Sequence, residues 1–243
     1  MLPTLKEKES ELPKLNSNLM ERMKMFMLQS QSFQEMMMMY SCAIREVRTK
    51  AEVLNDEMSV RYHRNPISRI TSRVKKPDSI ANKLYNKGLP FTVEAVMSNL
   101  NDVAGVRIIC EFIDDIYTIA AMLAMQDDLK MIKIKDYIKY PKSNGYRSYH
   151  MIVEIPVFFS KGKTPMRVEI QIRTMAMDFW ASLDHELKYK KDIDPKDEEV
   201  IAAELLSCAD RIADTDLIMQ QIRMKLDGVQ QQAHSKQEIV MQE

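Results

Sequence analysis

The sequence predicts an α+β protein with a mixed β-sheet of about five strands flanked by helices, and with long helices near both ends of the chain. Two observations support this fold class. The 243 residues contain only five glycines, and residues 14–65 contain neither glycine nor proline, which is typical of a long helix. Between residues 79 and 190, strand-like and helix-like segments follow one another, which indicates a sheet covered by helices on at least one face.

An apolar series with helical spacing predicts the first long helix. Its face is formed by Phe33, Met37, Tyr40, Ile44, Val47, Ala51, Leu54 and Met58. The methionines at 36–39 fall within it, and we interpret them as core or interface packing, because methionine favours helices and fills irregular space.

The middle of the chain predicts alternating short elements. A helix at 79–87 follows Pro77, with Asp78 placed to cap it. A buried strand is expected at 105–112, a helix at 116–125 and an alternating strand at 130–138. Two further strands at 150–157 and 166–173 precede a helix at 175–190, which contains the only tryptophan, Trp180.

A second heptad-like series predicts a C-terminal helix with an apolar seam: Ile201, Leu205, Cys208, Ile212, Thr215, Met219, Ile222 and Leu226. Such a seam requires a partner, and the pattern leaves open whether that partner is the N-terminal helix of the same chain or a second copy. The predicted organisation is an N-terminal helical segment (1–60), a central domain (61–190) and a C-terminal helical segment (191–243).

Composition limits the possible classes of protein. The 35 basic and 35 acidic residues cancel, so no global field attracts nucleic acid or a membrane surface. The three cysteines are far apart and lack CxxC spacing, which argues against a disulfide framework or a structural zinc site. With no apolar signal segment or long uncharged span, we expect a cytoplasmic protein without a membrane partner.

Positive charge is concentrated in two places. Residues 61–90 hold eight Lys or Arg against the single acid Asp78, and the segment 73–79 leads into a helix N-terminus, which favours a bound anion such as phosphate. Residues 130–147 hold a second cluster that ends in a turn carrying Tyr146, on which a planar base could stack. A solvated charged face, or a grip on single-stranded nucleic acid, would produce the same patterns.

The segment 168–174 alternates, so Glu169, Gln171 and Arg173 share one face. That face is either a solvated face of an antiparallel sheet or part of a binding site. Asp102 directly precedes the predicted strand at 105–112. Two carboxylates at adjoining strand ends in a basic cleft would form an oxygen site suited to Mg²⁺, which takes few protein ligands and completes its shell with phosphate and water.

Five segments in this order resemble the alarmone synthetases of the RelA/SpoT homologue family, especially the small stand-alone ones. They are 73–79 (RVKKPDS), 102–107 (DVAGVR), 142–150 (KSNGYRSYH), 168–174 (VEIQIRT) and 177–185 (MDFWASLDH). The resemblance covers about residues 60–190, and five ordered motifs are specific where one would be weak. It implies a nucleotidyltransferase-like sheet.

The resemblance also implies an activity. The β,γ-diphosphate of ATP would move to the 3′-hydroxyl of GDP or GTP, giving AMP and ppGpp or pppGpp, the alarmones of the stringent response. It implies a homo-oligomer, with a tetramer favoured, held by terminal helices, and it requires no stable nucleic-acid partner.

The resemblance assigns roles to individual residues. Asp102 and Glu169 would hold Mg²⁺, and Glu169 would be the candidate base. Arg73 and Arg107 would sandwich the adenine of ATP, and its phosphates would bind Lys75, Lys76, Ser79 and Lys83. Tyr146 would stack on the acceptor guanine, and the remaining acceptor-binding candidates are Lys142, Asn144, Arg147, His150, Gln171, Arg173 and Asp178.

Two features qualify this assignment. Residue 178 is Asp where related synthetases can carry Asn, although a carboxylate could still accept hydrogen bonds from guanine. No histidine is followed by Asp, so the hydrolase domain of longer relatives is not expected. Two other classes fit the same residues, namely a non-catalytic nucleotide- or RNA-binding module and a helical assembly protein. Within the enzyme class, the acceptor could also be an adenosine nucleotide or the 3′ end of tRNA.

Overall fold

The computed structural model describes residues 24–240 except 26, 28 and 189–194. The first part of the predicted N-terminal segment and the end of the helix predicted at 175–190 therefore lie outside the described residues. No helix in the described part is long and apolar enough to cross a membrane.

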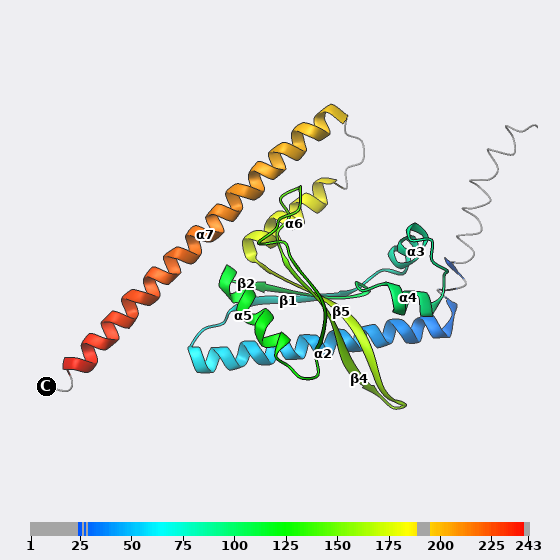
Figure 1. The fold of residues 1–243 in the computed structure, drawn as a ribbon, viewed down its shortest axis with the longest axis horizontal. Coiled ribbons are helices and arrows are strands. Elements are labelled where there is room, and N and C mark those ends of the chain that lie inside the picture. The colour runs from blue at the N-terminus through cyan, green and yellow to red at the C-terminus, as the bar shows by residue number, and fades with distance from the viewer. Residues whose placement is uncertain (1–23, 26, 28, 189–194, 241–243) are drawn as a thin grey trace, which may run out of the picture.

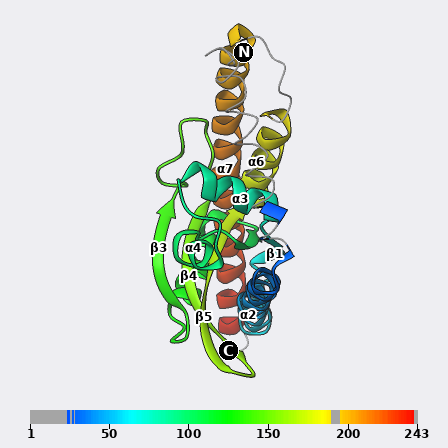
Figure 2. The ribbon, with the colours of Figure 1, turned by 90° about the vertical axis from the view of Figure 1, so that its right-hand side faces the viewer.

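A five-stranded mixed sheet forms the centre of the molecule, in the order β1-β2-β5-β4-β3. Its strands are β1 (Ile67–Val74), β2 (Ala104–Cys110), β3 (Lys130–Asp136), β4 (Tyr149–Phe159) and β5 (Gly162–Thr174). Strands β2 and β5 are parallel and the other neighbouring pairs are antiparallel. Figure 2 shows β3 at one edge of the sheet, with β4 and β5 beside it. The predicted fold class is confirmed, and four of the five strands lie where the sequence predicted them.

Helix α2 (Gln31–Tyr62) covers one face of this sheet, contacting β1, β2, β5 and β4 (Figure 1). It begins at Ser30, whose side chain accepts a hydrogen bond from the backbone N–H of Phe33. The predicted apolar face is confirmed except at Met37, which is only partly buried, whereas Met36 is buried. Of the methionine run, Met36 lies in the core and Met37 and Met39 pack partly against it, as predicted, whereas Met38 is exposed.

Three shorter helices accompany the sheet: α3 (Pro77–Asn86), α4 (Val93–Asn99) and α5 (Ile113–Ala124). The prediction that Asp78 caps α3 is wrong. The N-cap is Lys76, Pro77 is the first helical residue, and Asp78 lies in the first turn, where it pairs with Lys24 at 2.6 Å. Proline fits the first position of a helix because its missing N–H is not needed there.

Strand β1 and helix α4 were not predicted. β1 is an edge strand that pairs only with β2, and among its side chains only Ile67 is fully buried. An edge strand that exposes most of its side chains lacks the apolar alternation by which strands are recognised. The segment was therefore interpreted only as a run of positive charge.

Helix α6 (Met175–Lys188) follows β5 directly, and helix α7 (Pro195–Val240) packs against α6 and α5. Figure 1 shows α7 crossing the molecule on the side of α6, away from α2. The residues that α7 directs towards the body include Ala209, Ile212 and Asp216. Cys208 and Thr215 of the predicted seam are exposed, so the contact face departs from that seam at Cys208. Met219, Ile222 and Leu226, which belong to that seam, are exposed.

The two faces of the sheet therefore have different chemistry. The face towards α2 and α5 is apolar and carries buried side chains such as Val106, Ile108 and Ile170. The opposite face presents the alternate residues, and there the register aligns Arg73 with Gly105 and Glu169, and Thr71 with Arg107 and Gln171. This polar face carries the candidate site.

Candidate active site

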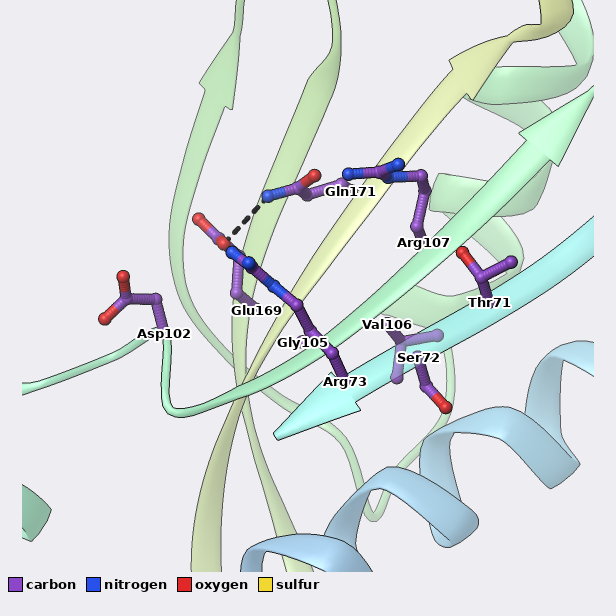
Figure 3. Close-up of a pocket in the computed structure, with 9 residues that line it drawn as sticks. All are labelled: Thr71, Ser72, Arg73, Asp102, Gly105, Val106, Arg107, Glu169 and Gln171. Carbon is purple, nitrogen blue, oxygen red and sulfur yellow. Dashed lines mark hydrogen bonds between the residues drawn. The ribbon is translucent and has the colours of Figure 1, made fainter. Parts of the chain in front are cut away.

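A cavity of about 170 Å³ opens over the polar face of β1, β2 and β5. Strand β1 contributes Arg73, β2 contributes Arg107, and β5 contributes Glu169, while Asp102 reaches the cavity from the loop before β2 (Figure 3). The full lining comprises Thr71, Ser72, Arg73, Asp102, Gly105, Val106, Arg107, Glu169 and Gln171. Two acids and two arginines that are distant in sequence therefore share one cavity.

Asp102 is held by two lysines. Its Oδ2 atom accepts hydrogen bonds from Nζ of Lys75 at 3.0 Å and from Nζ of Lys83 at 2.6 Å. Burial opposes the charged form, but these hydrogen bonds and the lysine charges hold the pKa of the Asp102 carboxyl below its ordinary value. Its Oδ1 atom is buried and has no hydrogen-bond partner within the described protein. One oxygen of an ionised carboxylate is thus available for a further ligand.

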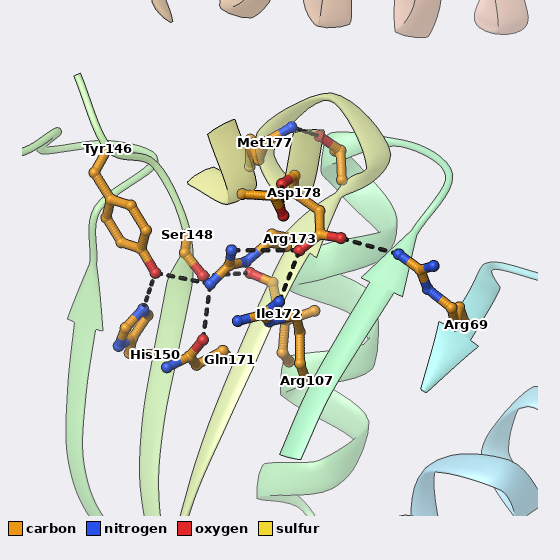
Figure 4. Close-up of polar contacts among 12 residues, drawn as sticks. Arg69, Arg107, Tyr146, Ser148, His150, Gln171, Ile172, Arg173, Met177 and Asp178 are labelled. Carbon is orange, nitrogen blue, oxygen red and sulfur yellow. Dashed lines mark hydrogen bonds and ion pairs between the residues drawn. The ribbon is translucent and has the colours of Figure 1, made fainter. Parts of the chain in front are cut away.

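Glu169 belongs to a closed ring of polar contacts with Gln171, Arg173, Tyr146 and His150. Figure 3 shows Glu169 with Gln171, and Figure 4 shows the other four residues of the ring. Its Oε2 accepts from Nε2 of Gln171 at 2.9 Å, and its Oε1 lies 3.3 Å from Nδ1 of His150. Oε1 of Gln171 accepts from Nη2 of Arg173 at 2.7 Å. The same Nη2 donates to the Tyr146 hydroxyl at 2.8 Å, which lies 2.9 Å from Nε2 of His150.

The directions of these hydrogen bonds are consistent around the ring. An ionised Glu169 can only accept, so Nδ1 of His150 carries a hydrogen, and in a neutral imidazole Nε2 then accepts from the Tyr146 hydroxyl. Burial opposes ionisation of Glu169, but the contacts with His150 and Gln171 lower the pKa of its carboxyl. The ring therefore couples the candidate base to the candidate stacking residue.

Asp178, in the first turn of α6, binds three arginines from three strands (Figure 4). Its Oδ2 accepts from Nη2 of Arg69 at 3.0 Å, and its Oδ1 accepts from Nη1 of Arg107 at 3.2 Å and of Arg173 at 3.4 Å. Both carboxylate oxygens thus face guanidinium groups rather than an open acceptor pocket. Burial lowers the pKa of Arg173, while Tyr146 and Asp178 act in the opposite direction.

The loop that carries Tyr146 is attached to the two C-terminal helices. Arg147 donates to the carbonyl oxygen of Ala209 at 3.3 Å and to Asp210 at 3.0 Å, both on α7. Asn144 donates to Asp184 of α6 at 3.3 Å. Gly145 has a φ of +84°, and a Cβ atom there would collide with the side chain of Ala209. Arg147 and Asn144 therefore support the loop rather than point into the cavity.

The remaining predicted residues lie around this centre. Nζ of Lys142 lies over the Tyr146 ring, 4.6 Å from its centroid, and Lys142 is exposed, so a base stacking on that face would displace its ammonium group. Lys76 and Ser79 are exposed at the start of α3, outside the lining of the cavity. They flank Lys75 and Lys83, which reach Asp102.

Two contributors to the site are not among the residues predicted for it. Arg69, an unassigned member of the basic run, pairs with Asp178, and the edge of the Tyr137 ring packs on both Tyr146 and His150. Arg69 lies four residues before Arg73, so both share the polar face of β1. Recognising β1 as a strand would have placed Arg69 beside the site.

The donor set fits a divalent cation with few protein ligands. The described residues contain no cluster of three or more His, Cys, Asp or Glu side chains arranged to hold a metal. Mg²⁺ commonly binds through one or two carboxylates and completes its octahedron with substrate phosphates and water. Asp102, with its free buried oxygen, and Glu169 on the same cavity provide such a pair. The surrounding lysines and arginines suit a polyphosphate.

Comparison with known proteins identifies the region that carries this site. Residues 72–194 match the family described as the region found in RelA/SpoT proteins. The chain is 45% identical over 173 residues to the GTP pyrophosphokinase YwaC of Bacillus subtilis, covering 70% of this chain and 82% of that protein. It is 38% identical over 151 residues to the GTP pyrophosphokinase YjbM of the same organism, covering 62% and 70%.

Solved structures agree with these relationships. Small alarmone synthetase 2 from Bacillus subtilis superposes with a TM-score of 0.71 at 38% identity, covering 80% of this chain and 100% of the other. Small alarmone synthetase 1 from Bacillus subtilis, bound to its product pppGpp, gives a TM-score of 0.72 at 32% identity and covers 81% and 98%. The matched family region, residues 72–194, spans β2, β3, β4 and β5 and the end of β1.

Proposed function

This chain belongs to the RelA/SpoT family, and from this membership we propose that it is a GTP pyrophosphokinase that makes ppGpp or pppGpp. It transfers the β,γ-diphosphate of ATP to the 3′-hydroxyl of GDP or GTP and releases AMP. The observation that carries the proposal is the convergence of Asp102 and Glu169 on one cavity with Arg73 and Arg107. A site that only bound phosphate would gain nothing from two acids, since they repel an incoming anion.

The reaction needs charge neutralisation and positioning more than covalent help. The 3′-oxygen of the acceptor bonds to the β-phosphorus of ATP, the bond from that phosphorus to the oxygen of the α-phosphate breaks, and AMP leaves with that oxygen. Glu169 orients the 3′-hydroxyl and takes up its proton as the new bond forms. Because its pKa is lowered, Glu169 is ionised at neutral pH and is a weak base, so orientation is its larger contribution.

On the ATP side, Arg73 and Arg107 lie on neighbouring strands and both line the cavity, as a sandwich around adenine requires. Lys75 and Lys83 donate to Asp102 in the structure. They would bind the phosphates of ATP when a divalent cation replaces them as the partner of Asp102. Lys76 and Ser79 extend this cradle at the N-terminus of α3, where free N–H groups favour anions.

On the acceptor side, Tyr146 stacks on the guanine, and Lys142 moves from the Tyr146 ring towards the acceptor phosphates. The hydrogen bonds of the polar ring fix Tyr146 and Glu169 relative to each other, through His150, Gln171 and Arg173. Asn144 and Arg147 contribute indirectly, by fixing the loop on α6 and α7.

We propose Mg²⁺ as the cofactor, held by Asp102 and Glu169. When bound, it would neutralise charge on the phosphates of ATP. The free buried oxygen of Asp102 supports this assignment.

We further propose a cytoplasmic homo-oligomer, with a tetramer favoured. Three free cysteines are consistent with a reducing compartment, which also supplies the nucleotides. The exposed apolar residues of α7 are a suitable surface for self-association: Leu217, Ile218, Met219, Ile222, Met224 and Leu226.

The proposal is tested by incubating the purified protein with ATP, Mg²⁺ and either GDP or GTP, and resolving the nucleotides by ion-exchange chromatography. AMP and a guanosine tetra- or pentaphosphate are expected in equal amounts. Glu169→Gln abolishes both products, because the amide has no charge to hold the cation, orients the 3′-hydroxyl less well and cannot accept its proton. The matched control is Glu154→Gln on the neighbouring strand β4, which pairs with the exposed Lys130 and should remain active.

Two outcomes would overturn the proposal. Tight nucleotide binding without any AMP would indicate a non-catalytic binding module. AMP formed with an adenosine nucleotide or tRNA as acceptor, and not with GDP or GTP, would assign a different pyrophosphokinase.

A further inference from the structure

We propose that Asp178 is a positioning residue that fixes Arg107 and Arg173 together, so that the residues bound to ATP and those bound to the acceptor are aligned before either nucleotide arrives. The inference rests on the proposed function, because it assigns Arg107 to the ATP side and Arg173 to the acceptor side. It differs from the assignment of Asp178 to the guanine, since its two oxygens already accept from three guanidinium groups.

The fold places this carboxylate where it can reach three strands. Asp178 is on the first turn of α6, immediately after β5, and a helix N-terminus stabilises a negative side chain. The register aligns Arg69 with Ile109 and Ile109 with Arg173, while Arg107 lies two residues before Ile109 on β2. The three arginines thus converge on one side of the sheet from β1, β2 and β5, beneath α6.

Burial restricts the positions that Asp178 and Arg173 can take. The side chain of Arg173 is 2% exposed and that of Asp178 is 10% exposed, so water cannot replace either partner. The Nε atoms of Arg107 and Arg173 are both buried, without a hydrogen-bond partner in the part of the chain that the structure describes. Asp178 is the carboxylate that pairs with both guanidinium groups. The Arg107 side chain is 38% exposed, so the cost of losing this partner falls mainly on the buried Arg173.

Arg107 and Arg173 each connect Asp178 to one half of the site. Arg107 lines the cavity beside Arg73 and Glu169. Arg173 donates to the Tyr146 hydroxyl and to Gln171, which in turn donates to Glu169. A shift of Asp178 would therefore disturb the adenine contact and the acceptor contact at the same time.

The test is Asp178→Asn, which keeps the size of the side chain and removes its charge. The amide keeps one acceptor oxygen, but its NH2 group replaces the other and faces guanidinium groups that can only donate. We expect the KM for ATP and the KM for the acceptor each to rise about tenfold or more, because small misplacements of positioning groups have effects of this size. Steady-state rates of AMP formation, with each substrate varied in turn, measure both constants.

The two KM values separate positioning from a merely structural role. A protein that is only less well folded has fewer active molecules, so kcat falls while both KM values stay at the wild-type values. That result, or a rise in the acceptor KM alone, would overturn the inference. The second pattern would assign Asp178 to the guanine. A wild-type protein that forms no AMP would instead refute the proposed function.

Three further variants complete the design. Asp216→Asn removes another buried carboxylate that contacts Thr174, and both KM values should stay unchanged. Arg69→Gln removes the most exposed arginine of the cluster, 62% exposed, and should raise both KM values, but by less than Asp178→Asn does, because solvent screens this ion pair. Asp178→Glu keeps the charge but displaces it by one methylene. This variant replaces Asp178→Asn as the test if Asp178→Asn does not fold. We expect both KM values to rise, and wild-type values in Asp178→Glu would contradict the inference.

Discussion

Removing the side chain of Tyr146 separates its two contributions to the site. Tyr146→Ala loses both the ring proposed to stack on guanine and the hydroxyl that joins Arg173 to His150. Tyr146→Phe loses the hydroxyl alone. The two variants therefore test stacking and the polar ring independently.

The magnitudes follow from the contacts. Stacking of one base on an aromatic side chain contributes about 1–3 kcal/mol, so Tyr146→Ala should raise the acceptor KM by about 5- to 150-fold. The hydroxyl accepts from a charged guanidinium at 2.8 Å, a type of hydrogen bond that contributes about 1.5–3 kcal/mol. Tyr146→Phe should therefore lower kcat through the disturbed Glu169 while raising the acceptor KM much less than Tyr146→Ala.

Initial rates of AMP formation, with one nucleotide varied at saturating concentrations of the other, measure these effects. Tyr117→Phe is the control, because it removes a tyrosine hydroxyl that donates to Asp136 outside the cavity. Both of its KM values should match the wild type. Equal increases of the ATP and acceptor KM values in Tyr146→Ala would refute the assignment of Tyr146 to the acceptor.

Three other predictions concern stability and assembly. Burial raises the pKa of the Asp216 carboxyl above its ordinary value of 3.8, so the folded protein loses stability as pH rises through the raised value. Asp216→Asn removes this titration and should unfold at a higher temperature than wild type at pH 7. Below pH 3.8 the two unfolding temperatures should not differ. Gly145→Ala should cost about 2–4 kcal/mol in denaturant unfolding, because it adds a collision with Ala209 to the strain of a positive φ, whereas Gly88→Ala, at φ +64° in open space, should cost only about 1 kcal/mol. Ile222→Glu should lower the mass in solution by light scattering, whereas Gln221→Glu on the adjacent face should not; an unchanged mass in Ile222→Glu would exclude this part of α7 from the interface.

Much of the fold could be predicted because local pattern and tertiary role agree. The apolar spacing of α2 reflects a helix that packs along a whole sheet, and four strands alternate or form apolar runs. β1 could not be predicted in this way, because an edge strand next to a ligand site carries polar residues where a core strand carries apolar ones. Its recognition depends on pairing with β2, which is not a local property.

The candidate site was predictable in composition but not in connectivity. Spacing alone placed Glu169, Gln171 and Arg173 on one face, and the structure shows them hydrogen-bonded in that order. The attachment of Arg147 to α7 and of Asp178 to three arginines depends on how helices return to the sheet. Such long-range contacts between charged side chains leave no periodic signal in the sequence.

The central claim, that two acids in a basic cavity direct a diphosphate from ATP to a guanosine 3′-hydroxyl, is tested most directly with ATP labelled at the β-phosphate. The label should move to the guanine nucleotide when GDP or 2′-deoxy-GDP is supplied, with unlabelled AMP as the other product. With 3′-deoxy-GDP, which lacks the attacking hydroxyl, no transfer should occur. Label that stays in ADP, or that still reaches the 3′-deoxy acceptor, would contradict the account.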